Sequence, residues 1–249
     1  MPKVIGIIPS RFASKRFPGK PLALLGGLPI IVRVYNQAKK ATILDEVIVA
    51  TDDHRIYDTV IEHNGRAIIT TGNFVCGSER VASVAKDTKA DIIINIQGDE
   101  PLISPSVIEK VANVLIDNPK AKMSTACSPI GGIDEINNPN VVKLVLDKNN
   151  RALYFSRSRI PWFNEADKDI NLNTLPIYHH FGIYGFTAEF LQTYVKLGQS
   201  KLEEIESLEQ LRVLENGYDI YCVIASQIYS GIDSQEDLFK AEQILESMG

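Results

Sequence analysis

The chain has 249 residues, of which 45% are hydrophobic and 23% charged, and a formal net charge of −5. This composition is typical of a globular protein with a sizeable core. The acidic balance argues against nucleic acid or an anionic membrane as the main partner, because both favour a broadly basic face. Cys76, Cys127 and Cys222 are odd in number and lack CxxC spacing, which favours reduced core thiols and argues against zinc.

The first apolar run, residues 4–9, is too short for a secretion signal or a bilayer span. We therefore expect a cytoplasmic protein without membrane insertion. The N-terminal region is basic, since no Asp or Glu occurs between residues 1 and 44.

Short runs rich in Val and Ile alternate with amphipathic stretches in the first half of the chain. Residues 4–9, 46–51, 67–70 and 91–97 have the pattern of buried parallel strands, and residues 30–41, 53–64 and 78–88 have that of helices. Ser104 followed by Pro105 predicts the start of a further helix that runs towards residue 118. The βαβ repetition predicts an α/β fold with a doubly wound, mostly parallel sheet.

The alternation is less regular after residue 120. Strands are expected over 122–130, 141–147, 152–156, 180–186 and 219–226, one helix over 202–217, and a last helix over 236–248. The irregular, polar segment at about 160–180 predicts a substrate lid or a subunit contact. No internal repeat is found, so a single domain over 1–249 with this excursion is expected.

The loop PSRFASKRFPGKP, residues 9–21, carries Arg11, Lys15, Arg16 and Lys20 without an acidic residue. It follows the first strand, at the sheet edge where α/β proteins bind ligands. Guanidinium and ammonium groups suit phosphate, whereas the alternative is a solvated basic turn. Pro21 excludes a Walker loop, and no GxGxxG turn follows the strand.

The segment NIQGDEPLI, residues 95–103, places Asp99 and Glu100 at the end of the most apolar strand. A carboxylate that faces a basic phosphate loop across one sheet edge is what a magnesium-phosphate site requires. Asp99 is the stronger candidate for a metal ligand. The alternative for both residues is a role in the turn or as a helix cap, and for Glu100 this alternative is favoured. Asp52 or Asp53 is expected to cap the following helix, and residue chemistry alone also favours a capping role for Asp233.

Eight segments in order resemble the 3-deoxy-manno-octulosonate (Kdo) cytidylyltransferases, the CMP-Kdo synthetases of Gram-negative lipopolysaccharide assembly. They include PSRFASKRFPGKPLALLGGLPII, NIQGDEPLI, ALYFSRSRIPW, HFGIYGF, LEQLRVLENG and GIDSQEDL, and the resemblance extends from about residue 3 to residue 240. It implies a fold of the nucleotide-diphospho-sugar transferase type, a Mg²⁺-dependent cytidylyltransferase and a homodimer. The implied reaction converts CTP and Kdo into CMP-Kdo and pyrophosphate.

The resemblance also implies roles for individual residues. Lys20, Asp99 and Asp233 match catalytic positions, and the two aspartates match the metal ligands, which replaces the capping interpretation of Asp233. The implied nucleotide-binding residues are Arg11, Ser14, Arg16, Lys20, Ser78, Arg80 and Gln97. The implied sugar-binding residues are Arg157, His180, Tyr184, Glu209 and Gln210.

Two rival hypotheses remain. One is a related nucleotidyltransferase that uses sialic acid or an 8-amino analogue of Kdo. The other is a catalytically silent nucleotide-binding protein, against which Lys20, Asp99 and Asp233 argue, because a binding protein has no need of two metal carboxylates.

Overall fold

The structure is a computed structural model that describes residues 1–13, 17–164, 175–226 and 231–248. In this part of the chain nine strands form one sheet, whose central path runs β11-β7-β10-β6-β1-β4-β5. The parallel block consists of β1 Val4–Ser10, β4 Glu46–Thr51, β5 Ala67–Ile69 and β6 Ile92–Asn95. The four parallel strands expected in the first half of the chain are confirmed.

Strand β10, Tyr178–Thr187, runs antiparallel to both of its neighbours, β6 and β7. Beyond it, β7 (Met123–Pro129) and β11 (Tyr221–Ile224) pair in parallel. Strands β8 (Lys143–Leu146) and β9 (Ala152–Ser156) form an antiparallel pair beside β10. The sheet is therefore mostly parallel, as predicted, and β10 joins its two parallel parts.

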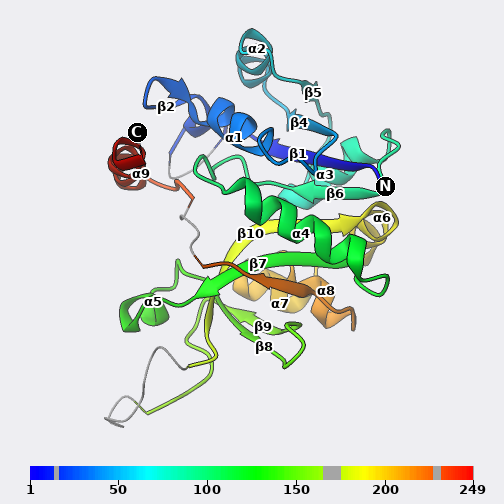
Figure 1. The fold of residues 1–249 in the computed structure, drawn as a ribbon, viewed down its shortest axis with the longest axis vertical. Coiled ribbons are helices and arrows are strands. Elements are labelled where there is room, and N and C mark those ends of the chain that lie inside the picture. The colour runs from blue at the N-terminus through cyan, green and yellow to red at the C-terminus, as the bar shows by residue number, and fades with distance from the viewer. Residues whose placement is uncertain (14–16, 165–174, 227–230, 249) are drawn as a thin grey trace.

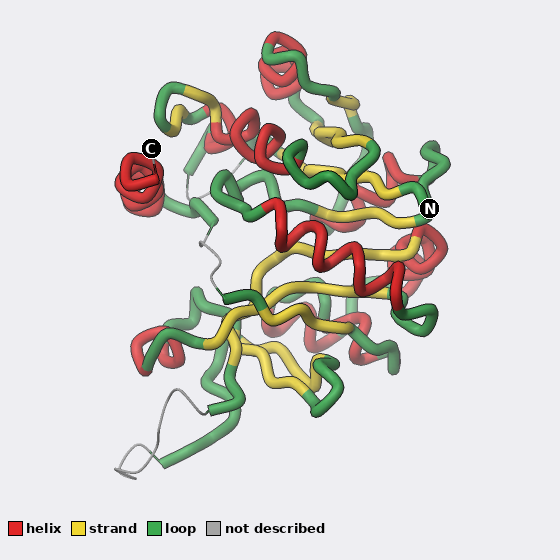
Figure 2. Tube along the Cα trace, viewed as in Figure 1, coloured by secondary structure: helices red, strands yellow, loops and turns green. Residues whose placement is uncertain are grey.

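Helices cover both faces of the sheet (Figures 1 and 2). Alternate residues of β1 enter two different cores, Val4 and Ile8 on one face and Ile5 and Ile7 on the other. This is why the strand is an apolar run rather than an alternating one. The first core contains residues of α1 Ile30–Ala38, α2 His54–Glu62, α4 Pro105–Asp117 and α9 Gln235–Met248, and the second contains residues of α3 Gly77–Ala85, α6 Ala188–Leu197, α7 Lys201–Glu206 and α8 Leu211–Glu215.

Three small elements complete the described fold. The 3-10 helix η1 (Lys20–Leu22) follows the basic loop and leads into a hairpin of β2 (Leu24–Leu25) and β3 (Leu28–Pro29). Helix α5 (Ile133–Asn137) packs in a separate apolar cluster with Val141 and Ile177. The sequence patterns did not predict the hairpin, α5 or α6.

The prediction of one continuous helix over 202–217 is wrong. Two short helices, α7 and α8, occupy this region, and the chain leaves the first at Ser207, whose φ of 53° and ψ of 48° are left-handed. A left-handed residue ends an α-helix, and the apolar spacing of the two helices continues across this break. The break places Glu209 and Gln210 on the turn that leads into α8.

The excursion predicted at about 160–180 falls largely on residues 165–174, which lie outside the described residues. In its described part, Trp162 is exposed, and the guanidinium of Arg159 lies 3.7 Å from the ring centroid of Phe163.

Candidate functional site

Lys20, Asp99 and Asp233 meet at the carboxyl edge of the parallel strands. The ammonium of Lys20 lies 2.7 Å from Asp99 Oδ2 and 3.2 Å from Asp233 Oδ1, and it also donates to the carbonyl oxygen of Ile232 at 2.7 Å. The structure thus brings together three residues that are up to 213 positions apart in the sequence.

Two glycines, Gly98 and Gly231, allow backbone segments at this edge of the sheet to approach one another closely. A Cβ at Gly98 would lie 2.9 Å from the carbonyl oxygen of Pro9, and a Cβ at Gly231 would lie 3.2 Å from that of Asp99. The amide of Ile232 donates to the same Asp99 carbonyl at 2.8 Å. The backbone therefore holds the Asp99 turn against the segment that carries Asp233.

Capping does not account for Asp233. Helix α9 is capped by Ser234, whose hydroxyl accepts from the amide of Asp237, while Asp237 accepts in return from the amide of Ser234. The carboxylate of Asp233 points to Lys20 instead. The capping prediction for Asp53 is confirmed, because its carboxylate accepts from the amide of Arg55.

Glu100 lies beside this cluster. Burial, together with the negative charges of Asp99 and Asp233, raises the pKa of Glu100 to about 8, although Lys20 opposes the shift. Near pH 7 the side chain of Glu100 is therefore mostly protonated and uncharged, while Asp99 and Asp233 bind the ammonium of Lys20.

We call Lys20, Asp99 and Asp233 the Lys20 cluster. A cavity of about 380 Å³ opens next to it. This volume is within the range of small-molecule sites. Its lining comes from β10, from the turn between α7 and α8, and from the ends of β6 and β9. The lining residues are Cys76, Gln97, Asp99, Val142, Arg157, His180, Gly182, Tyr184, Ser207, Leu208, Glu209, Gln210 and Asp233. All five residues predicted for the sugar side are among them.

Arg157 is held by backbone acceptors at the edge of this cavity. Its Nε donates to the carbonyl oxygen of Glu206 at 2.9 Å and its Nη1 to that of Pro139 at 3.1 Å, while the carboxylate of Glu206 accepts from the Arg157 amide. Behind it, the buried ammonium of Lys143 donates to three carbonyl groups, including that of Arg157. The guanidinium therefore enters the cavity from a fixed backbone with donors still available for an anion.

His180 is neutral in this environment. Burial, followed by the influence of His179, lowers the pKa of His180 to about 3. The hydroxyl of Thr125 donates to the carbonyl of Ile183 at 2.7 Å and lies 2.9 Å from His180 Nε2. Since the single proton of Thr125 is used in this way, Nε2 carries the imidazole proton and Nδ1 is an acceptor.

Gln210 has an unused donor at the cavity. Its Oε1 accepts from the hydroxyl of Tyr184 at 3.0 Å, whereas its buried Nε2 has no hydrogen-bond partner among the described residues. A buried amide without a partner is costly unless a ligand or water completes it. The arrangement suits a ligand oxygen.

The residues predicted for the nucleotide side are less closely grouped. Gln97 lines the cavity, and Ser78 is buried, with its hydroxyl accepting from Asn95. Arg80 instead joins two strand ends, because it donates to Asp52 at 2.6 Å and to Thr70 at 2.5 Å. Arg11 is exposed, and Ser14 and Arg16 lie outside the described residues.

A second cavity, of about 570 Å³, adjoins the first, because both are lined by Asp99, His180, Gly182 and Asp233. Its other walls are Glu100, Asn138, Asn140, Val141, His179, Phe181, Gly231, Ser234, Glu236, Asp237 and Lys240. The sequence analysis assigned no role here to Asn138 or Asn140, although both belong to the segment NPNVVKLVLD, residues 138–147, which is one of the eight that resemble the family.

The Lys20 cluster fits a divalent cation that binds together with phosphate. Asp99 and Asp233 supply carboxylate oxygens around a position that attracts the Lys20 ammonium, and Mg²⁺ usually takes one or two carboxylates plus phosphate oxygens and water. The described residues contain no group of three or more His, Cys, Asp or Glu side chains able to hold a metal ion by themselves.

No described helix is long and apolar enough to cross a membrane.

The chain is similar to known proteins over nearly its full length. A family model described as cytidylyltransferase matches residues 5–220. A protein of Fusobacterium nucleatum named 3-deoxy-manno-octulosonate cytidylyltransferase is 47% identical over 98% of this chain and 96% of its own length. One of the same name from Trichlorobacter lovleyi is 42% identical over 97% of this chain and 98% of its own length.

Solved structures are also similar. A CMP:2-keto-3-deoxy-manno-octonic acid synthetase complexed with CTP superposes with a TM-score of 0.91 at 36% identity, over 99% of this chain and 100% of that chain. A nucleotidyl transferase from Methanothermobacter thermautotrophicus superposes with a TM-score of 0.64 at 18% identity, over 99% of both chains. At this lower identity the likeness concerns the fold alone.

Proposed function

We propose that this chain, which belongs to the cytidylyltransferase family, transfers CMP from CTP to the anomeric hydroxyl of Kdo and releases pyrophosphate. One observation carries the proposal. A single cavity joins the Asp99 and Asp233 carboxylates to the five side chains expected to bind the sugar. A phosphoryl-transfer enzyme needs this proximity, because its catalysis consists largely of positioning and charge stabilisation.

The acid sugar has a natural place in the cavity. Arg157 suits its carboxylate, because a guanidinium can donate two parallel hydrogen bonds to carboxylate oxygens. The free amide donor of Gln210 and the acceptor Nδ1 of His180 suit its hydroxyl groups. The carboxylate of Glu209, which also lines the cavity, would accept further hydrogen bonds from these hydroxyl groups.

The nucleotide is expected next to Lys20 and the basic loop, residues 9–21. Lys20, with Arg11, Ser14 and Arg16 from the basic loop, would neutralise the triphosphate, and Gln97, Ser78 and Arg80 would support the nucleoside. We propose that Asp99 and Asp233 hold Mg²⁺, which when bound supplies positive charge to the reacting phosphates. Lys20, which contacts both carboxylates, would share them with that ion and would donate to the departing pyrophosphate.

In the reaction, the anomeric oxygen of Kdo bonds to the α-phosphorus of CTP, and the bond between that phosphorus and the oxygen of the leaving pyrophosphate breaks. Arg157, His180 and Gln210 orient the sugar for in-line attack. His180 does not act as the general base, because an imidazole with a pKa of about 3 is too weakly basic at neutral pH. The hydroxyl proton is therefore expected to leave through water.

The reaction is tested by pyrophosphate release from CTP and Mg²⁺ with Kdo, its 8-amino analogue and sialic acid in parallel. Release with Kdo at the highest kcat/KM is expected. Release with sialic acid alone would contradict the Kdo assignment, and no release with any sugar would favour a nucleotide-binding protein. Repeating the assay with EDTA and then with restored Mg²⁺ tests the metal requirement.

Three wider proposals accompany this function. The activated sugar would serve lipopolysaccharide biosynthesis, the enzyme would act in the cytoplasm, and it would form a homodimer through the segment at about 160–180. Sedimentation equilibrium of the intact chain tests the dimer, because a monomer at micromolar concentration would contradict it.

A further inference from the structure

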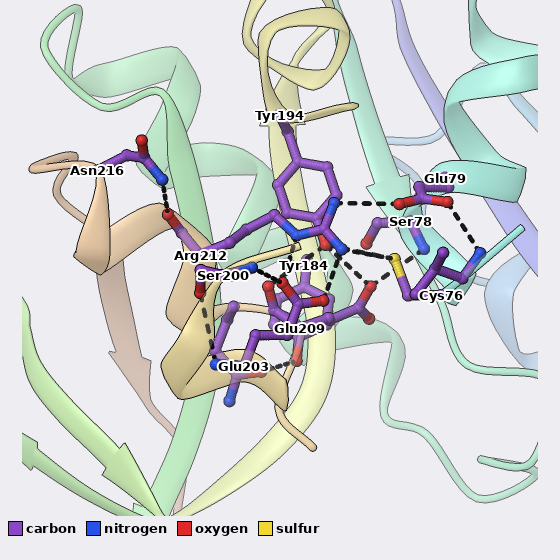
Figure 3. Close-up of polar contacts among 12 residues, drawn as sticks. Cys76, Ser78, Glu79, Tyr184, Tyr194, Ser200, Glu203, Glu209, Arg212 and Asn216 are labelled. Atoms are coloured by element: carbon purple, nitrogen blue, oxygen red, sulfur yellow. Dashed lines mark hydrogen bonds and ion pairs between the residues drawn. The ribbon is translucent and has the colours of Figure 1, made fainter. Parts of the chain in front are cut away.

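A group of polar side chains, three of them buried and one partly buried, lies behind the cavity and takes no part in the roles assigned above. It consists of Arg212 on α8, Tyr194 on α6, Glu203 on α7 and Glu79 on α3 (Figure 3). None of the four lines either of the two cavities. We call this group the Arg212 cluster.

Arg212 is fully buried and its charge is matched on two sides. Its Nε and Nη2 bind the two carboxylate oxygens of Glu203 at 2.6 and 2.5 Å, and its Nη1 donates to Glu79 at 3.1 Å. Burial opposes the charge, yet the hydrogen bonds with Glu203 outweigh it and the pKa of Arg212 is raised. The guanidinium is thus a permanently charged anchor between α7, α8 and α3.

Tyr194 connects this anchor to the cavity. The guanidinium of Arg212 lies 4.5 Å from the centroid of the Tyr194 ring, and the ring of Phe186 lies 5.6 Å away on another side. The Tyr194 hydroxyl reaches Glu209 Oε2 and the Glu209 carbonyl oxygen, both at 3.3 Å, and Cys76 Sγ at 3.3 Å. The Tyr194 hydroxyl donates to Glu209, and burial raises the pKa of the neighbouring Cys76 thiol.

Glu209 in turn reaches the start of α3. Its Oε2 accepts from the amide of Ser78 at 3.2 Å, one of the first-turn amides of α3 that have no partner within the helix. The N-cap residue of α3, Cys76, makes no side-chain capping bond. Glu209, a cavity residue, therefore acts as the cap of a helix far away in the sequence, and two donors determine the direction of its carboxylate.

We propose that Tyr194 is a positioning residue for Glu209, with Arg212 as its anchor, and that it orients this carboxylate for the acid sugar. The inference rests on the proposed function for the identity of the sugar. A glutamate side chain in water samples many rotamers, and ordering it on binding lowers affinity. A carboxylate oriented in advance avoids that loss, whereas the triphosphate, which is expected beside Lys20, gains nothing from it.

A purely structural role would not require this arrangement. Buried ion pairs can often be replaced by apolar side chains with no loss of stability, and a phenylalanine would fill the same ring space as Tyr194. The hydroxyl adds a hydrogen bond directed at a cavity carboxylate. Its removal should therefore affect the sugar more than the fold.

The test compares Tyr194→Phe with a matched control, Tyr218→Phe. Tyr218 packs against the same core, with its ring 4.9 Å from that of Phe190, and it lies outside both cavities. We expect Tyr194→Phe to raise the KM for Kdo about tenfold, as for the loss of one hydrogen bond to a charged group, and to change the KM for CTP by less than about twofold. Tyr218→Phe should leave both KM values unchanged.

An independent measurement needs no substrate. Amide hydrogen exchange of Ser78, followed by NMR, should be faster in Tyr194→Phe and in Glu209→Ala, and the double variant should exchange no faster than Glu209→Ala alone, since Tyr194 acts through Glu209. Equal increases in both KM values, kinetics like those of Tyr218→Phe, or unchanged Ser78 exchange would overturn the proposal. Should the wild-type protein release no pyrophosphate with Kdo, the proposed function fails, and the Ser78 exchange still decides whether Tyr194 holds Glu209.

Discussion

The neutral, buried state of His180 predicts a specific dependence of stability on pH. The imidazole is 6% exposed, and its ring centroid lies 4.7 Å from that of Phe155 and 5.7 Å from that of Tyr184. Its pKa falls from 6.5 in the unfolded chain to about 3 in the native protein, through burial above all. Between these values the unfolded chain binds a proton and the native protein does not.

This difference in proton binding makes the protein less stable as the pH falls. The stabilisation is fully present above pH 6.5 and is lost as the pH falls towards 3, because protonation then favours the unfolded state. Between about pH 7.5 and pH 5, one such histidine lowers the free energy of unfolding by about 2 kcal/mol. For a chain of this length, that is a decrease in Tm of roughly 4 to 8 °C.

Urea unfolding of the wild type, His180→Asn and His54→Asn at several pH values measures this contribution. Carboxylates also titrate in this range, so the informative quantity is the difference between two pH profiles. His180→Asn is expected to be less stable at pH 7.5, where packing is lost, and to lose about 2 kcal/mol less than the wild type on acidification. His54 is exposed, and its replacement is the matched control for the loss of one histidine. Parallel profiles for His180→Asn would refute the buried neutral imidazole.

Three further substitutions test the site. Asp99→Asn should lower kcat by at least about a hundredfold while the circular dichroism spectrum stays native, because it removes one of the two carboxylates that bind Lys20; near-normal turnover would contradict its role. Lys20→Ala should lower kcat/KM for CTP by a similar factor of about a hundred, whereas unchanged kinetics would return the basic loop to a solvated turn. Lys143→Met should lower the free energy of unfolding by about 2 to 4 kcal/mol in urea, because the donor of one buried and two partly buried hydrogen bonds to carbonyl groups is lost. A loss below about 0.5 kcal/mol, as expected for a surface substitution such as Lys240→Met, would contradict this.

Local sequence patterns determined the parallel part of the sheet and one side of the site. Apolar runs such as 91–97 must be buried on both faces, and this requirement is visible without any knowledge of distant contacts. Asp99, which follows such a run at the sheet edge, was a metal-ligand candidate for the same reason. The basic loop pointed to an anion because its charges repel one another unless a ligand joins them.

The tertiary structure alone decided which distant groups share that edge. The pairing of Asp233 with Lys20 depends on the close approach of the Gly231 segment to the turn at Asp99, and the periodicity of the sequence does not predict such an approach. The break at Ser207 was likewise hidden, because the apolar spacing of α7 and α8 continues through it while a single left-handed residue turns Glu209 and Gln210 to the cavity.

The Arg212 cluster shows the same division between local and long-range information. The local sequence around Tyr194 and Arg212 does not distinguish them from ordinary helix residues. Neither the burial of the ring nor that of the guanidinium can be read from neighbouring residues. Their partners, Glu79 and Glu209, come from other elements, and only packing against the sheet brings them within hydrogen-bonding distance. The sequence alone thus determined the parallel part of the sheet and the edge at which the basic loop and Asp99 lie, because these depend on local periodicity and charge. The cavity wall that contains Glu209 and Gln210 depends on contacts between distant elements, which only the fold creates.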